Sequence, residues 1–134
     1  MLRIVLASGE HESLARFAAG LRQNCRIDLL QVDSGADVLK ATEQKAVDLV
    51  VVGENLTDMA PVEFIGKLVR TRPTINCAMV SALGHDDFHE ATEGLGVLMQ
   101  LPPDPSSDDA EILLKKVEVL AGLFAGQTAR ESEK

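Results

Sequence analysis

Tryptophan and tyrosine are absent from the sequence, and phenylalanine occurs only four times. Lysine and arginine are also absent from the long stretch between Arg72 and Lys115. Nucleic-acid binding depends on clustered basic side chains and, for single strands, on aromatic rings that stack on the bases. The sequence therefore argues against a nucleic-acid partner.

Cysteine and long apolar runs are scarce as well. Cys25 and Cys77 lack CxxC spacing, which favours buried, reduced thiols over a disulfide or a metal site. No apolar run approaches the roughly 20 residues of a spanning helix, and no basic and apolar leader is visible. We therefore expect a soluble, cytoplasmic protein without membrane association.

The 134 residues are 46% apolar and carry a formal net charge of −8. This length suits one domain, which we place at residues 1–125, with a polar tail or the start of a linker at 126–134. Acidic residues fill the stretch without lysine or arginine: Asp86, Asp87, Glu90, Glu93, Asp104, Asp108, Asp109 and Glu111. One half of the domain should be negative, which favours a basic protein partner.

The most apolar segment is residues 47–52, where every side chain from Leu49 to Val52 is apolar. A strand that is apolar on both faces belongs in the middle of a parallel sheet with helices on either side. Gly53 ends this run, and a polar loop then leads through Pro61 into a helix. Open α/β sheets bind ligands in the crevice outside such strand ends.

The remaining chain alternates between strand and helix patterns. We predict further strands at 2–7, 26–32, 75–82 and within 94–103, and helices at 12–23, 34–45, 62–72, from His85, and at 110–124. This alternation predicts an α/β fold with a doubly wound, five-stranded parallel sheet of order 2-1-3-4-5.

The segment from Asp48 to Phe64 resembles the third strand and following helix of bacterial response regulator receiver domains of the chemotaxis-regulator type, and Leu56, Asp58 and Met59 fit the loop of that family. The resemblance spans residues 2–124. It implies a flavodoxin-like receiver fold and a role in two-component phosphorelay signal transduction.

The same resemblance places the phosphoacceptor aspartate of receivers at Gly53. Their pair of magnesium-binding acidic residues falls on Ser8 and Gly9, and their lysine on Leu101 or Pro102. The aromatic position falls on Leu98 or Met99. Only the hydroxyl position is retained, at Ser81, where a hydrogen bond to local backbone is the simplest role.

We therefore expect a degenerate receiver, or pseudo-receiver, that acts by protein-protein interaction, without aspartyl phosphorylation, enzymatic activity or a cofactor. Glu54 and Asp58 are other candidate acceptors, but a lone carboxylate lacks the metal that would stabilise the transferring phosphoryl group. We also expect Glu54 to point away from the crevice. The alternative is a small-ligand sensor that uses the emptied pocket.

We place the partner face on the helix that begins at His85, the strand after it and the last helix. Its predicted contact residues are Asp86, Asp87, Glu90 and Glu93, and its partner is a kinase, an output domain or a second copy in a homodimer. His85 and His89 are four residues apart, but a zinc site needs a third ligand, so we predict no metal.

Overall fold

The structure, a computed structural model, describes residues 2–23 and 27–119. Predictions that concern Cys25, the end of the last helix and the tail at 126–134 lie outside the described residues.

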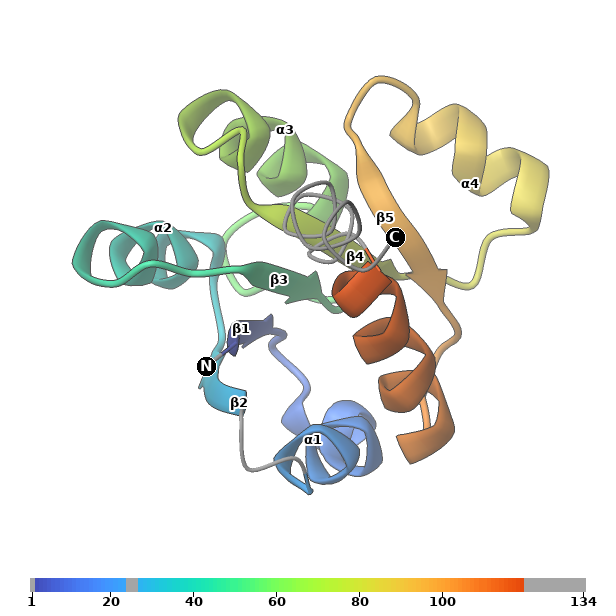
Figure 1. The fold of residues 1–134 in the computed structure, drawn as a ribbon. Coiled ribbons are helices and arrows are strands. Elements are labelled where there is room, and N and C mark those ends of the chain that lie inside the picture. Colours follow the sequence, from blue (N-terminus) through green and yellow to red (C-terminus); the bar gives the residue numbers. More distant parts are fainter. Residues whose placement is uncertain (1, 24–26, 120–134) are drawn as a thin grey trace, which may run out of the picture.

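Five parallel strands form one sheet in the order β2-β1-β3-β4-β5, as predicted (Figure 1). The strands are β1 at Leu2–Ala7, β2 at Ile27–Val32, β3 at Leu49–Val52, β4 at Asn76–Val80 and β5 at Val97–Leu101. The apolar run is thus the central strand, with β1 and β4 as its neighbours.

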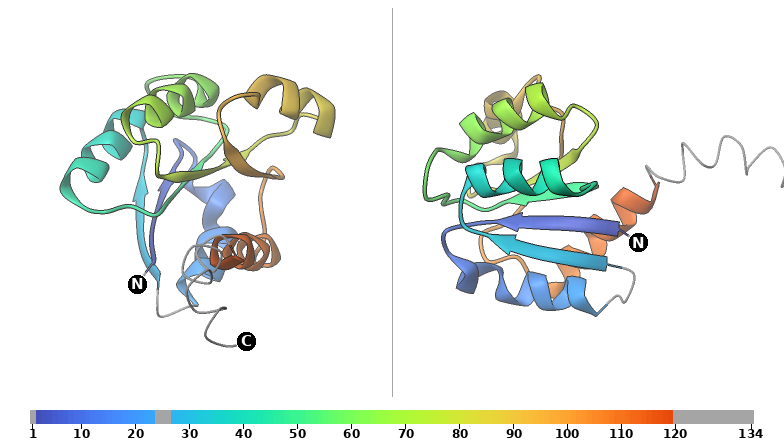
Figure 2. Two further views of the ribbon diagram at one scale, coloured as in Figure 1. Left: turned by 45° about the horizontal axis from the view of Figure 1, so that its top comes forward. Right: turned by 90° about the vertical axis from the view of Figure 1, so that its left-hand side faces the viewer.

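Helices cover both faces of the sheet (Figure 2). One face carries α1 at Ala15–Arg22 and a C-terminal helix at 107–119, and the other carries α2 at Gly35–Gln44, α3 at Pro61–Thr71 and α4 at His85–Thr92. A short 3-10 helix, η1 at His11–Leu14, precedes α1. No helix in the described ranges is long and apolar enough to cross a membrane.

The C-terminal helix starts three residues earlier than the predicted residue 110, because its first turn is capped. Ser106 and Asp109 bond reciprocally: the Ser106 backbone N–H donates to Asp109 Oδ2 at 2.8 Å, and the Asp109 N–H donates to Ser106 Oγ at 3.4 Å. Such a pair satisfies N–H groups that have no partner within the helix.

All four side chains of β3 are fully buried. Leu49 and Val51 pack toward α1 and the C-terminal helix, whereas Val50 and Val52 pack toward α2 and α3. This alternation explains why a polar side chain is absent from every position of the strand. Cys77 on the neighbouring β4 is a free, buried thiol, as predicted, and desolvation raises its pKa to about 11.

A β-bulge interrupts β5 at the edge of the sheet. Cys77 pairs with Val97 while Ala78 pairs with Met99, so Leu98 is an extra residue in β5. Leu98 and Met99 both pack on the face of the C-terminal helix, and the shifted alternation leaves Gln100 free to bond toward α4.

The crossing of α1 and the C-terminal helix generates the first prediction. A Cβ atom at Gly20 would lie 2.9 Å from Ser107 Cα and 3.1 Å from Ala110 Cβ, so Gly20→Ala must push the two helices apart. We expect a loss of about 1–3 kcal/mol in the free energy of unfolding, measured by urea denaturation.

Gly66→Ala in α3 is the matched control, because nothing lies within 4 Å of its added Cβ. Alanine there should be neutral or stabilising by up to about 1 kcal/mol. Equal effects of the two substitutions would contradict close packing at Gly20.

Candidate functional site

A small cavity of about 140 Å³ lies beyond the carboxyl ends of the central strands. Its lining residues are Ser8, Glu10, Ser13, Leu14, Gly53, Glu54, Asn55, Val80, Pro103 and Asp104. The fold thus brings Ser8 and Gly53 together, as expected for strands that end at one edge of a parallel sheet. Acidic side chains border the cavity, and no lysine or arginine is among these lining residues.

The side chain of Ser8 fills the space beside Gly53. A Cβ atom at Gly53 would lie 2.7 Å from both Cβ and Oγ of Ser8, and the Gly53 N–H donates to the Ala7 carbonyl at 2.7 Å. Gly53 does not have a left-handed backbone, since the described glycines with positive φ are Gly94 and Gly96. Close approach of β1 to β3, and not backbone conformation, is therefore what requires glycine at position 53.

Ser8 is itself held by the turn that follows β1. Its Oγ accepts from the Glu10 N–H at 3.0 Å and donates to the Glu10 carbonyl at 3.3 Å, and only 2% of its surface is exposed. The Gly9 N–H bonds to the Asn55 carbonyl, and Asn55 Nδ2 donates to Glu10 Oε1 at 2.8 Å. Hydrogen bonds between protein groups thus join the β1 and β3 loops.

Glu54 is among the residues that line the cavity, and it is exposed to solvent. Across the described part of the chain, no three His, Cys, Asp or Glu side chains form a group that could hold a metal ion. Glu10, Glu54 and Asp104 therefore border the cavity without forming a metal site.

The two candidate lysine positions have different environments. Leu101 is fully buried in the core beneath the C-terminal helix, whereas Pro102 is exposed and the next residue, Pro103, lines the cavity. No cationic group extends from this end of β5 toward Gly53, because the residues there are leucine and proline.

The Ser81 hydroxyl bonds to the backbone of the loop before α4. Its Oγ accepts from the Leu83 N–H at 3.1 Å. Gln100 Nε2 donates to the carbonyls of Ser81, at 3.1 Å, and Leu83, at 2.8 Å. These bonds attach the loop that leads into α4 to the edge strand β5.

Asp58 caps the N-terminus of α2. Its carboxylate accepts from the N–H groups of Gly35, at 2.9 Å, and Ala36, at 3.1 Å. The bond from Gly35 is the largest of the effects that lower the pKa of Asp58 below its usual value. The sequence offered no sign of this role, because Asp58 and Gly35 are 23 residues apart.

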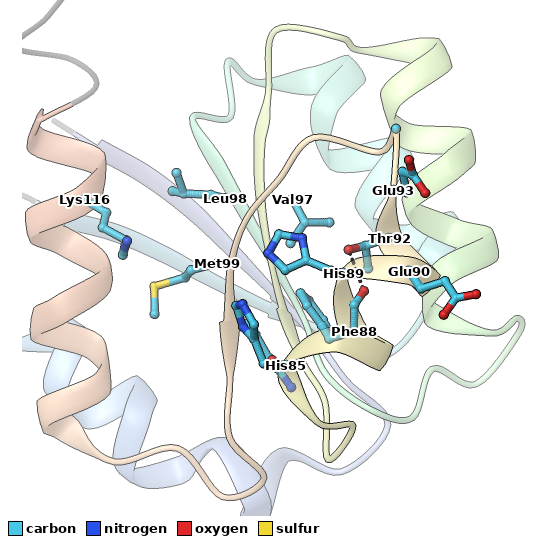
Figure 3. A pocket seen from close by; sticks show the side chains of 12 residues that line it. His85, Phe88, His89, Glu90, Thr92, Glu93, Val97, Leu98, Met99 and Lys116 are labelled. Carbon is cyan, nitrogen blue, oxygen red and sulfur yellow. Dashed lines mark hydrogen bonds between the residues drawn. The ribbon is translucent and has the colours of Figure 1, made fainter.

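A larger groove of about 900 Å³ lies between α4, β5 and the C-terminal helix (Figure 3). Glu90 lines it from α4 and Glu93 from the residue after α4, whereas Asp86 and Asp87 are exposed on α4 outside the lining. The rings of His85 and His89 meet edge to face, with centroids 4.7 Å apart.

Lys116 borders the same groove from the C-terminal helix, so the predicted partner face is not free of basic residues (Figure 3). The stretch without lysine or arginine ends at Lys115, which lies within the C-terminal helix, and the fold places this helix beside β5. The acidic and basic residues are far apart in the sequence, but the fold brings them to one surface.

The cap at α2 generates a prediction on pH dependence. Asp58→Ala removes the acceptor for two helix N–H groups and should lower the thermal midpoint at pH 7. The pKa of Asp58 is lower in the folded protein than in the unfolded protein. The charged carboxylate therefore stabilises the fold fully above the unfolded pKa of about 3.9, and this stabilisation is lost as pH falls through the folded pKa. The difference in midpoint from the parent protein should therefore narrow below about pH 4.

Glu54→Ala, an exposed carboxylate in the same loop, is the control and should change the midpoint little. A difference between the parent and Asp58→Ala that stays constant from pH 7 to pH 2 would contradict a charge-dependent cap.

The contact between Ser8 and Gly53 generates a third prediction. Gly53→Ala should destabilise the protein by about 1–3 kcal/mol through overpacking. In a Ser8→Gly background the same substitution should cost much less, which a double-mutant cycle of urea denaturations measures. Additive effects would show that Ser8 is not what excludes a side chain at position 53.

Comparisons with known proteins identify the fold. No protein-family model matches the chain. A search of curated proteins likewise finds no match.

Solved structures do match, and several are receiver domains. The signal receiver domain of an HD domain-containing protein from Pseudomonas fluorescens Pf-5 has a TM-score of 0.76 and 15% identity, covering 97% of this chain and 92% of that chain. A CheY-like response regulator receiver domain protein from Methanospirillum hungatei JF-1 has a TM-score of 0.75 and 17% identity, with coverages of 88% and 94%. The chemotaxis response regulator CheY4 of Vibrio cholerae has a TM-score of 0.74 and 14% identity, with coverages of 87% and 98%. The chain thus has the flavodoxin-like fold of response regulator receiver domains.

Proposed function

We propose that this chain is a pseudo-receiver: a two-component signalling domain that acts through protein contacts, without aspartyl phosphorylation and without catalysis of its own. The observation that carries the proposal is Gly53 at the end of β3, with the Ser8 side chain occupying the adjacent space. The receiver fold of its structural neighbours supports the signalling role.

Phosphoryl transfer to a receiver needs a carboxylate nucleophile, a metal ion held by further carboxylates, and a cation on the developing charge. Gly53 supplies no nucleophile, and Ser8 and Gly9 supply no carboxylate. Leu101 lies in the core, and Pro102 carries no charge. All three requirements are therefore unmet at the positions that the family resemblance assigns to them.

The other nearby carboxylates already have roles in the fold. Asp58 accepts two hydrogen bonds at α2, and Glu10 accepts one from Asn55. Glu54 borders the cavity, but a lone carboxylate has no group to neutralise the transferring phosphoryl charge. This supports the proposal that neither Glu54 nor Asp58 is an alternative acceptor.

Small-ligand sensing at the emptied pocket has less support. The cavity at Gly53 holds about 140 Å³, whereas ligand pockets usually measure about 300–1,000 Å³. Hydrogen bonds between Ser8, Glu10 and Asn55 already join the loops that would have to open. We therefore propose that the domain acts through the surface formed by α4, β5 and the C-terminal helix. We also propose that its partners are proteins of the cytoplasm.

A phosphorylation assay tests this function. Incubated with acetyl phosphate and Mg²⁺, the protein should gain no phosphoryl mass by intact-mass spectrometry, because the nucleophile, metal ligands and cation are absent together. Gly53→Asp alone should also remain unlabelled. The matched positive variant combines Ser8→Asp, Gly9→Asp, Gly53→Asp and Pro102→Lys.

Stoichiometric, acid-labile labelling of the parent protein would overturn the proposal, and the same assay on Glu54→Gln and Asp58→Asn would then locate the acceptor. Labelling of Gly53→Asp alone would show that a metal site exists without the acidic pair, with Glu10, which lines the same cavity, as a candidate ligand.

A further inference from the structure

β2 is an edge strand, and its outer side has no strand partner among the described residues. On its inner side it pairs with β1 along its whole length, from Ile27 opposite Leu2 to Val32 opposite Ala7, without a bulge. Figure 2 shows β2 at the margin of the sheet, with α1 on one face and α2 on the other. The edge is therefore open to a further strand.

The backbone of β2 presents donors and acceptors on this open side. The Ser8 N–H donates to the Val32 carbonyl at 3.0 Å, so the backbone groups of Val32 point toward β1. Because these groups alternate along a strand, those of Leu30 also point toward β1, and those of Leu29 and Gln31 point outward. Within residues 2–23 and 27–119, no hydrogen bond reaches the outward groups.

The β2 edge also lacks the features that normally prevent pairing at an open edge, which are lysine side chains, proline, bulges and unpaired charges. The one charged side chain of β2 is Asp28, and it is paired with Arg3 of β1 at 2.9 Å. The opposite edge strand, β5, does carry a bulge, at Leu98. In addition, β2 presents Leu30, a large aliphatic side chain that is 45% exposed. Of the two edges, β2 is thus the one suited to pairing.

We propose that β2 pairs with β2 of a second copy in antiparallel orientation, about a two-fold axis beside Leu30. Leu30 then lies opposite Leu30 of the other copy, and Leu29 of each copy exchanges backbone hydrogen bonds with Gln31 of the other. The sheets of the two copies become one continuous sheet. This inference goes beyond the proposed function, because β2 lies at the edge of the sheet opposite β5.

The position of the axis follows from the pairing rules and from charge. The outward groups of both copies meet only when a residue lies on the axis, and an axis beside Leu29 or Leu30 pairs most of the strand. An axis beside Leu29 places Asp28 against Leu30 and holds the two Asp28 residues about 7 Å apart along the strands, within the Debye length of about 8 Å. An axis beside Leu30 places leucine on leucine and separates them by about 13 Å.

Charge also favours this edge for contact between two copies. Each copy has a net charge of −8, so two copies repel one another in most orientations. At the β2 edge the charge of Asp28 is offset by Arg3, and Arg22 of α1 donates to Gln31 Oε1 at 3.2 Å. A second β2 supplies the complementary backbone groups and the matching leucine, as a two-fold interface requires.

Proline tests the backbone pairing. Gln31→Pro removes an outward N–H and places the ring where the second strand would lie, but it breaks no bond to β1. We expect sedimentation equilibrium to show self-association at least about tenfold weaker than in the parent protein. Gln31→Ala is the matched control: it removes the same side chain and its bond to Arg22 but keeps the N–H, so its association should stay within about threefold of the parent.

Charge exchange at Leu30 tests the two-fold axis and does not depend on whether the proline variant folds. Leu30→Lys and Leu30→Glu each place like charges on the axis, so each variant alone should associate at least about tenfold more weakly than the parent. In a 1:1 mixture the new lysine of one copy lies opposite the new glutamate of the other. The mixture should therefore associate at least about tenfold more strongly than either variant alone.

Leu83→Lys and Leu83→Glu are the controls for this exchange, because Leu83 is 48% exposed and lies outside β2. They should associate as the parent does, alone and mixed. A parent that stays monomeric up to about 1 mM, the weak limit of specific association, would overturn the inference. So would a mixture of the Leu30 variants that fails to recover, or Leu30→Lys associating more strongly than the parent, which would place residue 30 opposite Asp28.

These outcomes are separate from the phosphorylation assay. A monomeric, unlabelled protein would overturn the pairing of β2 and leave the proposed function standing. A protein that is labelled and still pairs through β2 would do the reverse.

Discussion

Complete burial of β3 is the constraint on which the rest of this structure depends. Four adjacent apolar side chains point alternately to the two faces of the sheet, so helices must cover both faces. Parallel neighbours on each side require crossover connections, and these bring the carboxyl ends of the strands to one edge. The position of the candidate site follows directly from that requirement.

At that edge, the loops are held by bonds between protein groups. Ser8 fills the space beside Gly53, Asn55 bonds to Glu10, and Asp58 caps α2. Each contact uses a polar group to join two loops or a loop to a helix. Hydrogen bonds within the protein therefore satisfy these polar groups at the edge, which agrees with the proposal that the domain acts through a surface elsewhere.

The bulge in β5 shapes the surface formed by α4, β5 and the C-terminal helix. The bulge in β5 places Leu98 and Met99 on the same face and leaves Gln100 able to bond to the loop before α4. The loop, α4 and the edge strand are thereby connected. The C-terminal helix then adds lysines and exposed aliphatic side chains to a region whose sequence is otherwise acidic.

The sequence by itself determined the strands, the order of the sheet and the position of Gly53 at its edge. The strands and the place of Gly53 follow from local patterns, because an apolar run marks a buried strand and a glycine or proline marks its end. The order of the sheet follows from the alternation of strands and helices along the whole chain. The resemblance of residues 48–64 to receivers also agrees with the fold of the structural neighbours.

Only the tertiary structure decided the cap of α2 by Asp58, the contact of Ser8 with Gly53 and the place of Lys116 beside the groove at α4. Each depends on groups that are 20 or more residues apart in the sequence. Periodicity within one segment cannot reveal such contacts, because they depend on how the segments pack against one another.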